Sequence, residues 1–266
     1  MKNIVSFGGG VQSTALAIMV MQERLPKPDL WLFADTGDEP ARVYTHVEKW
    51  MDRFNRWGWP FEVVHRFDDF TPLSDHVVTK VQSGKGSFNP PFFVEREDGK
   101  ACPVRRKCTY EYKMRPLDKR AKEFAEGERV RKWVGISYDE RQRERISDKP
   151  WFDFYYPLIE LRLNRSDCQK IISDFGETAP RSACVFCPFH SDDEWRNIKK
   201  NDADWDRAVG FEKEIHRLYD AGFTQGLKSK PYLHPSRVPL HKINWTNNQR
   251  TLFSSMDQEC FGLCGV

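Results

Sequence analysis

The chain has 266 residues, of which 39% are hydrophobic and 30% are charged, and its formal net charge is +3. This length and composition predict a soluble globular protein with one large domain, or one domain with an added subdomain. No apolar run approaches the roughly 20 residues that a membrane-spanning helix needs, and the N-terminus lacks the charged-then-apolar pattern of a secretory signal. Composition therefore argues against a membrane protein, and a cytoplasmic location is the default expectation.

A glycine turn lies between an apolar stretch and a helical pattern at the start of the chain. Residues 4–14 read IVSFGGGVQST, which predicts a short buried strand, a turn and the start of a helix. Consecutive glycines remove every Cβ from the turn, so main-chain N–H groups can approach a ligand, and the free N–H groups of a first helical turn favour an anion. We expect the phosphate or sulfate end of a nucleotide here, and the alternative is a tight turn with no ligand. The residues expected at the nucleotide are Ser6, Phe7, Gly8, Gly9, Gly10, Gln12 and Ser13.

Strand and helix patterns then alternate along the chain. The predicted elements are a helix over 13–22, a strand over 29–34, a helix with apolar residues at 43, 47, 50, 51 and 54, a strand over 61–65, a helix over 113–126, a strand over 132–137, a helix capped by Ser166 and ending at Phe175, and a helix over about 192–221. Residues 66–118 are less regular, and the last forty residues predict an irregular tail. This order predicts a doubly wound, mostly parallel α/β sheet, which binds ligands at the carboxyl ends of its strands. We expect a nucleotide-binding domain over 1–165 and a helical and irregular region over 166–266.

Several short motifs follow the glycine turn in order. The second strand ends in Asp-Thr-Gly-Asp-Glu at 35–39, Cys108 precedes Lys113 and a Pro-Leu pair, and residues 135–141 read GISYDER. Together with the glycine turn, these motifs resemble the phosphoadenosine phosphosulfate reductase family of the adenine-nucleotide α-hydrolase (PP-loop) superfamily over about residues 1–190. The resemblance implies a Rossmann-like, HUP-type sheet that binds ATP or another adenine nucleotide. The further nucleotide contacts that it implies are Asp35, Thr36, Gly37, Glu39, Gly135, Glu140, Arg141 and Arg145, with Lys113 as a catalytic or phosphate-binding residue.

Two positions depart from the family's loop, which reads S-x-G-G-x-D-S in outline. Gly8 and Gln12 stand where that pattern has Ser and Asp. A carboxylate at the second position would help to hold Mg²⁺, so its loss weakens the case for magnesium-assisted ATP cleavage. A dinucleotide site with Asp35 on a ribose is a further alternative.

The seven cysteines of a chain without an export signal suggest metal or redox roles rather than disulfides. Cys184 and Cys187 have the spacing of half a metal site, and Cys102 and Cys108 are the candidates for the other half. Four thiolates suit a [4Fe-4S] cluster or a structural Zn²⁺, and unligated thiols are the third possibility. Cys168 lies in a predicted helix and is expected in the core.

The end of the chain reads ECFGLCGV and resembles the Glu-Cys-Gly-Leu-His tail of sulfonucleotide reductases. That resemblance implies that Cys260 and Cys264 attack sulfur or relay it, and the alternative is that neither has a role. A thiol pair on a glycine-rich tail is suited to thiol–disulfide chemistry.

Other charged residues carry weaker signals. Basic clusters at 105–107, 129–132 and 141–145 indicate either nucleic-acid contact or solvated faces. His190 is expected to pack near the Cys184 pair, and His234 has no spacing signal. The acidic run at 192–194 is expected to place charge at a helix N-terminus.

The sequence predicts an iron–sulfur-dependent enzyme that uses ATP to activate a substrate for thiolation, with a nucleic acid as substrate and a protein as sulfur donor. One alternative is a sulfonucleotide reductase. The other is a non-catalytic nucleotide-binding module stabilised by zinc.

Overall fold

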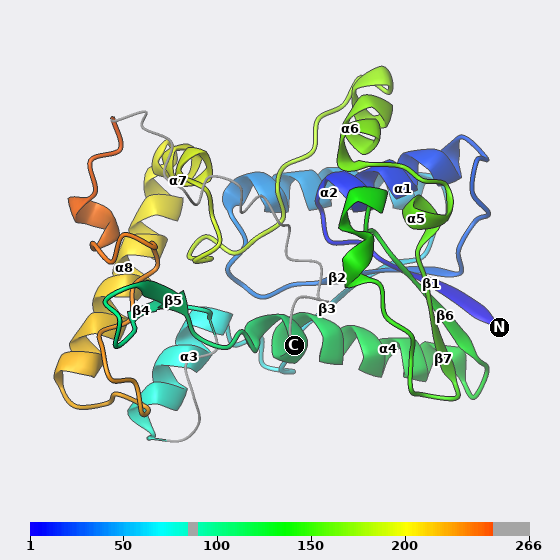
Figure 1. Ribbon diagram of the computed structural model, residues 1–266. Coiled ribbons are helices and arrows are strands. Elements are labelled where there is room, and N and C mark those ends of the chain that lie inside the picture. The colour runs from blue at the N-terminus through cyan, green and yellow to red at the C-terminus, as the bar shows by residue number, and fades with distance from the viewer. Residues whose placement is uncertain (85–89, 247–266) are drawn as a thin grey trace.

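The computed structural model describes residues 1–84 and 90–246. The two predicted tail thiols, Cys260 and Cys264, lie outside the described residues. Figure 1 shows a parallel sheet with helices on both faces and a second group of helices beside it. The fold is therefore α/β, as the alternating pattern predicts.

Five strands form the sheet, in the order β3-β2-β1-β6-β7, and every pairing is parallel. Their bounds are β1 (Lys2–Ser6), β2 (Leu30–Ala34), β3 (Phe61–Val64), β6 (Val130–Val134) and β7 (Phe152–Tyr155). All five residues of β2 are buried, which agrees with the continuous apolar run expected of a central parallel strand.

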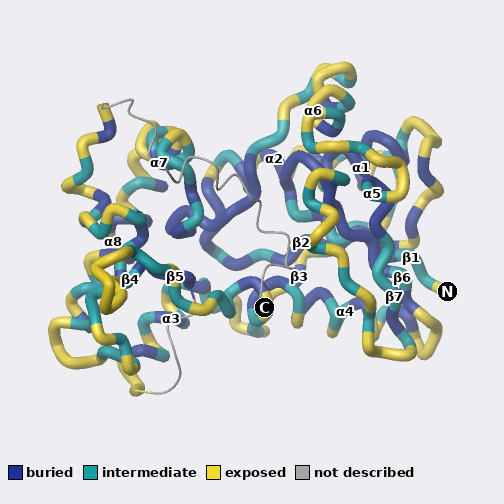
Figure 2. Tube along the Cα trace, viewed as in Figure 1, coloured by how far each residue is buried: buried dark blue, intermediate teal, exposed yellow. Residues whose placement is uncertain are grey.

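Helices cover both faces of the sheet. On one face, α1 (Val11–Met21), α2 (Ala41–Arg56) and α6 (Arg165–Asp174) share a core with Val5 and Trp31. On the other face, α4 (Arg115–Ala125) packs on Ile4 and Leu30. Adjacent strand residues therefore face opposite layers, and Figure 2 shows the buried backbone running through the sheet and α1. Cys168 is fully buried in the first of these cores, as predicted.

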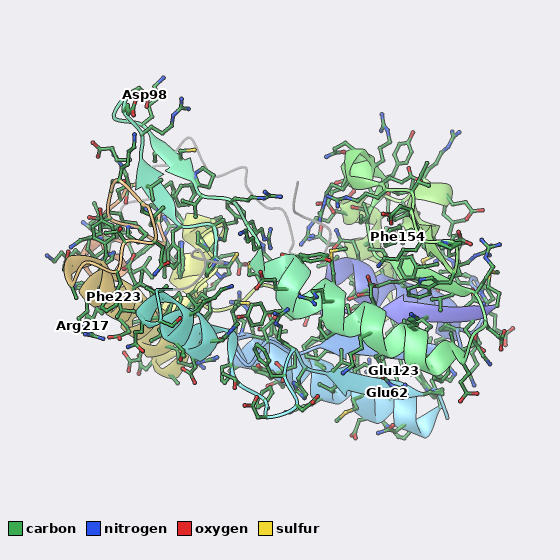
Figure 3. The ribbon with its side chains drawn as sticks, turned by 90° about the horizontal axis from the view of Figure 1, so that it is seen from below. Glu62, Asp98, Glu123, Phe154, Arg217 and Phe223 are labelled. Atoms are coloured by element: carbon green, nitrogen blue, oxygen red, sulfur yellow. The ribbon has the colours of Figure 1, made fainter. Side chains whose placement is uncertain are left out.

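A second hydrophobic core lies beyond the carboxyl ends of the strands. It is built from α3 (Leu73–Gln82), α7 (Asp192–Lys199), α8 (Asp202–Asp220) and the segment 184–186, with single residues such as Phe92 and Tyr112. Around it lie the hairpin of β4 (Phe93–Glu95) and β5 (Ala101–Pro103), the short π-helix η1 (Tyr110–Met114) and the 3₁₀ helix η3 (Leu240–Lys242). Asp98 marks the tip of the hairpin in Figure 3. This core takes residues from both sides of the predicted boundary at residue 165.

Several predicted elements need correction. The helix after residue 164 is capped by Asn164 rather than Ser166, because the Asn164 amide donates to Asp167 Oδ2 at 2.8 Å. The predicted helix over 192–221 is two helices, since Asn201 accepts from the Asp204 amide and starts a new one. The sequence prediction also lacked α3 and β7. Two short elements complete the sheet domain, η2 (Tyr138–Arg143) and α5 (Pro157–Glu160).

Within the described part of the chain, no helix is both long enough and apolar enough to cross a membrane.

Candidate functional site

The predicted nucleotide residues gather at the carboxyl edge of the sheet. From β1 the chain proceeds outward through β2 and β3, and it later adds β6 and β7 on the other side of β1. The switch point of the topology therefore lies between β1 and β6, which is where open α/β sheets bind ligands. The glycine turn follows β1, the acidic turn at 35–39 follows β2, and Gly135 follows β6.

The glycine turn has a conformation that only glycine fits well. Gly9 has φ +70°, and a Cβ at this position would lie 2.7 Å from Val47 Cγ2. Gly10 is extended, and its amide donates to Ser13 Oγ at 3.2 Å. The first amides of α1 have no acceptor within the helix itself, and the positive end of the helix dipole lies at the switch point. The turn is therefore shaped to accept an anion.

Gln12 joins α1 to the loop after β6. Its side-chain amide donates to Glu140 Oε2 at 3.0 Å, and its carbonyl oxygen accepts from Arg165 Nη1 at 3.2 Å. Gly135 allows this approach, since a Cβ there would lie 3.2 Å from both Gln12 Cβ and the Ser13 amide nitrogen. An Asp at position 12 would place a carboxylate opposite Glu140, so a neutral glutamine is electrostatically better suited to this position.

The arginines after Glu140 are placed differently from one another. Arg143 forms an ion pair with Glu140 at 2.6 Å. Arg141 is exposed, with its guanidinium 4.8 Å from the ring centre of Tyr138. Arg145 is half-buried, and its backbone amide donates to Tyr156. Arg165, which the sequence analysis did not identify, donates directly to Gln12, and the separation of 153 residues between the two leaves no sequence signal.

The acidic turn after β2 is held rigidly by its own side chains. Asp35 Oδ1 accepts from the Gly37 amide and from the Tyr44 hydroxyl, both at 2.8 Å. Asp38 accepts from the Ser74 amide at 2.7 Å and from Arg207 at 3.2 Å. Burial nevertheless raises the pKa of Asp38 to about 6. Asp35 and Asp38 therefore shape and anchor the turn.

Glu39 forms the centre of a buried polar cluster. Its Oε1 accepts from Lys113 Nζ at 2.7 Å, with the Glu39 side chain fully buried and the Lys113 side chain 9% exposed. Thr36 Oγ1 lies 3.4 Å from both Glu39 Oε1 and the Cys184 sulfur. Lys113 is therefore a buried, paired lysine and not a solvated one. Among the described residues, Glu39 Oε2 is buried without a hydrogen-bond partner, which marks an unmet acceptor in the cluster.

The four predicted metal ligands occupy different surroundings. Cys184 and Cys187 lie on one turn, where the Cys187 amide donates to the Cys184 carbonyl at 3.0 Å. Cys184 belongs to the second core and Cys108 packs against that core. Cys102 is half-buried on the β4–β5 hairpin, with its thiol 3.6 Å from the Pro103 carbonyl oxygen.

In residues 1–84 and 90–246, no three or more His, Cys, Asp and Glu side chains are arranged to hold one metal ion. The described residues therefore do not by themselves form the predicted [4Fe-4S] or Zn²⁺ site, and that site stays a prediction.

His190 packs beside the cysteine turn, as expected. Its Nε2 lies 2.8 Å from the Cys184 carbonyl oxygen, and its ring contacts Trp195 edge to face. Burial lowers the pKa of His190 well below its usual range. This neutral imidazole supports the turn that carries Cys184.

Neither a scan against models of protein families nor a search of curated proteins finds a match for this chain.

Proposed function

We propose that this protein is an adenine-nucleotide-dependent sulfur-transfer enzyme with a HUP-type nucleotide fold. The observation that carries the proposal is the placement of an anion-binding turn and a thiol-bearing cluster on neighbouring strands of one sheet. The glycine turn follows β1, and the Glu39–Lys113–Cys184 cluster is built on the turn after the adjacent β2.

In this proposal the nucleotide phosphates lie against the glycine turn. The first amides of α1 bind phosphate oxygens, and Arg141 and Arg145 supply cations near the end of β6. Lys113 is already neutralised by Glu39. It therefore acts as a positioned donor at a reacting oxygen rather than as a free counter-charge.

The proposed reaction begins with ATP. A substrate oxygen attacks the α-phosphate and releases pyrophosphate, and a sulfur nucleophile then displaces AMP from the adenylated carbon. A nucleic-acid base is the proposed substrate, and a sulfur-donor protein is the proposed source of the sulfur. Cys184 is the thiol that the described residues bring to the cluster, with its sulfur 4.0 Å from Glu39 Oε1. Cys260 and Cys264 are the proposed tail thiols.

Gln12 favours a second candidate, reduction of a sulfonucleotide. Because an amide replaces the carboxylate that would help to hold Mg²⁺, the site suits a reaction that releases a nucleotide without cleaving ATP. The non-catalytic zinc-stabilised module stays a further alternative; its ligand set is the same as that of the predicted cluster and is not assembled among the described residues.

A charged substitution at Gly8, with a neutral substitution of similar size as its control, tests the nucleotide site. Gly8 is half-buried in the turn, and Gly8→Asp would place a carboxylate against the bound phosphates, whereas Gly8→Asn adds nearly the same volume without charge. We expect calorimetry with ATP to show binding weakened more than tenfold by Gly8→Asp and less than threefold by Gly8→Asn, a difference in binding free energy of at least about 0.7 kcal/mol.

Equal affinities for the two variants, or no ATP binding by the native protein, would contradict the proposal. Pyrophosphate and AMP released from ATP would support thiolation. Sulfite released from phosphoadenosine phosphosulfate with a thiol donor would support the reductase.

A further inference from the structure

The segment 105–122, which leads into α4 and forms most of it, is strongly basic. It has eight Lys or Arg residues and two acidic residues, so its formal charge is +6, whereas the whole chain has +3. The rest of the chain is therefore net negative, and positive charge is concentrated on this segment. Figure 1 shows α4 along one face of the sheet, between the second core and β7.

Three of these cations share the solvent face of α4. Arg115, Lys119 and Lys122 are exposed, and their spacing of four and then three residues places them on one side of the helix. The opposite side of α4, with Leu117 and Ala121, packs into the core under the sheet. Figure 3 shows α4 in front of the sheet, so that its outer face can be seen.

An exposed tyrosine continues this face toward the start of the helix. The Arg115 amide donates to the Tyr110 carbonyl oxygen, and this bond over five residues puts Tyr110 one π turn before Arg115. The Tyr110 residue is 57% exposed. From Tyr110 to Lys122 the helix rises about 18 Å, which is the length of about five stacked nucleotides. We call Tyr110, Arg115, Lys119 and Lys122 the basic track.

The acidic side chains of α4 do not neutralise the basic track. Asp118 pairs with Lys132 and Lys149, at 2.9 and 3.2 Å, and Glu123 lies 3.9 Å from Arg120. Among the described residues, the three cations of the track have no ion pair. Like charges one helical turn apart destabilise a helix. Their repulsion is therefore a cost to the fold that a bound polyanion would remove.

The inner side of the same helical segment belongs to the proposed site. Lys113 lies between Tyr110 and Arg115 in sequence, but it is buried and pairs with Glu39. Because a helix with its side chains is about 10–12 Å wide, a strand on the basic track lies about one helix diameter from the Glu39–Lys113–Cys184 cluster. The track and the cluster are thus two sides of one element.

We propose that the basic track binds a single-stranded nucleic acid. Phosphates pair with Arg115, Lys119 and Lys122, and a base stacks on the exposed ring of Tyr110. A duplex offers phosphates but keeps its bases stacked on one another, so a single strand is the ligand that uses both features. This inference rests on the proposed function only for the reaction that a bound base undergoes, since the binding itself needs neither ATP nor a thiol.

Fluorescence anisotropy without ATP tests the track, with a labelled RNA of about 12 nucleotides and a DNA of the same sequence. Lys119→Gln should weaken binding at least threefold and reduce the slope of log affinity against log salt by about 0.7. Lys213→Gln is the matched control and should bind like the native protein. Lys213 is an exposed lysine within α8 that likewise has no ion pair among the described residues.

Substitutions of the tyrosine separate stacking from charge. Tyr110→Ala should weaken binding of the single strand at least fivefold, whereas Tyr110→Phe keeps the ring and should bind like the native protein. Melting temperatures identify any variant that fails to fold. A duplex of the same sequence, or polyglutamate, should compete at least tenfold less well than the unlabelled single strand.

No binding of either oligonucleotide by the native protein would overturn the proposal. Equal weakening by Lys119→Gln and Lys213→Gln, no effect of Tyr110→Ala, or equal competition by the duplex or by polyglutamate would overturn it too. Calorimetry of the native protein with ATP keeps the two proposals apart. Oligonucleotide binding without ATP binding supports the track and contradicts the proposed function, and ATP binding without oligonucleotide binding contradicts the track alone.

Discussion

His46 is a buried base beside the proposed nucleotide site. Its Nε2 lies 2.9 Å from Thr14 Oγ1 in the first turn of α1, and the residue is 7% exposed. Burial is the main reason that its pKa is lowered from 6.5 to about 4; the charge of Glu177 opposes this shift, and Lys49 and Arg53 add to it. The start of α1 is therefore packed against a group that stays neutral over most of the accessible pH range.

We expect this histidine to make the fold sensitive to acid. Below pH 6.5 the unfolded chain protonates His46 while the folded chain does not, so stability is lost as the pH falls toward the folded pKa. The cost reaches about 2 to 3 kcal/mol at pH 4.5. Denaturant unfolding at pH 7 and pH 4.5 should therefore show a smaller loss of stability in His46→Gln, which retains a hydrogen-bonding side chain.

The pH dependence of the native protein has to be compared with that of His46→Gln, because protonation of Asp38 changes the stability in the opposite direction. Its folded pKa is raised to about 6, so the folded chain takes up a proton there before the unfolded chain does, and stability rises as the pH falls through 6. Parallel stability curves for the native protein and His46→Gln would show that the acid sensitivity arises elsewhere.

At the scale of single elements, the start of α6 offers a direct check. The Asn164 amide donates to Asp167 at 2.8 Å, whereas Ser166 is exposed inside the first turn. Asp167→Ala removes this bond and a negative charge at the helix N-terminus, and we expect it to cost about 1 kcal/mol. Ser166→Ala, one residue away, should change the free energy of unfolding by less than half as much. Thermal unfolding of both variants decides between the two caps, and a larger effect at Ser166 would restore the sequence prediction.

Patterns with a strong period were predictable from the sequence. The apolar run of β2 and the helical spacing of Val43, Val47, Trp50 and Phe54 agree with the structure because each fills a continuous core face. Leu73, Val77 and Val81 have helical spacing too. They were missed because glycines and prolines surround them and only one face of α3 is apolar. No proline or glycine marks the break between α7 and α8, since an asparagine cap makes it.

The candidate site was predictable only where local sequence determines it. The turns after β1, β2 and β6 were expected at one edge because parallel strands end together. The side-chain contacts that cross this edge of the sheet could not be predicted. Arg165 reaches Gln12 from α6, and the two residues are 153 positions apart with no characteristic spacing.

At the scale of the whole molecule, the acidic turn connects the two cores. Arg207 of α8 donates to the carbonyl oxygens of Gly37 and Glu39 at 2.9 and 3.2 Å and pairs with Asp38. The Val185 amide also donates to the Asp38 carbonyl at 2.8 Å. The turn therefore receives donors from the second core while its other side faces the proposed nucleotide site. A structural change in one core should therefore be transmitted to the other core through these hydrogen bonds.

Replacement of Arg207 tests this connection, and replacement of Arg217 on the same helix is the matched control. Arg217 pairs only with Glu214 of its own helix among the described residues, and Figure 3 shows it at the periphery of the second core. Arg207→Met leaves Asp38 buried without its cation, so the pKa of Asp38 should rise above about 6. Loss of hydrogen bonds to a charged donor costs about 2 kcal/mol.

Amide hydrogen exchange shows which elements of the protein lose stability in Arg207→Met. If the second core opens on its own once the connection is cut, exchange in α7 and α8 should accelerate by about thirtyfold in Arg207→Met, while α1 keeps nearly its native rate. Arg217→Met should exchange like the native protein, since an exposed pair within one helix contributes little. Equal acceleration of α1 and α8 would mean that the cores open together whether or not Arg207 joins them, and the acidic turn would then be a contact within one cooperative unit.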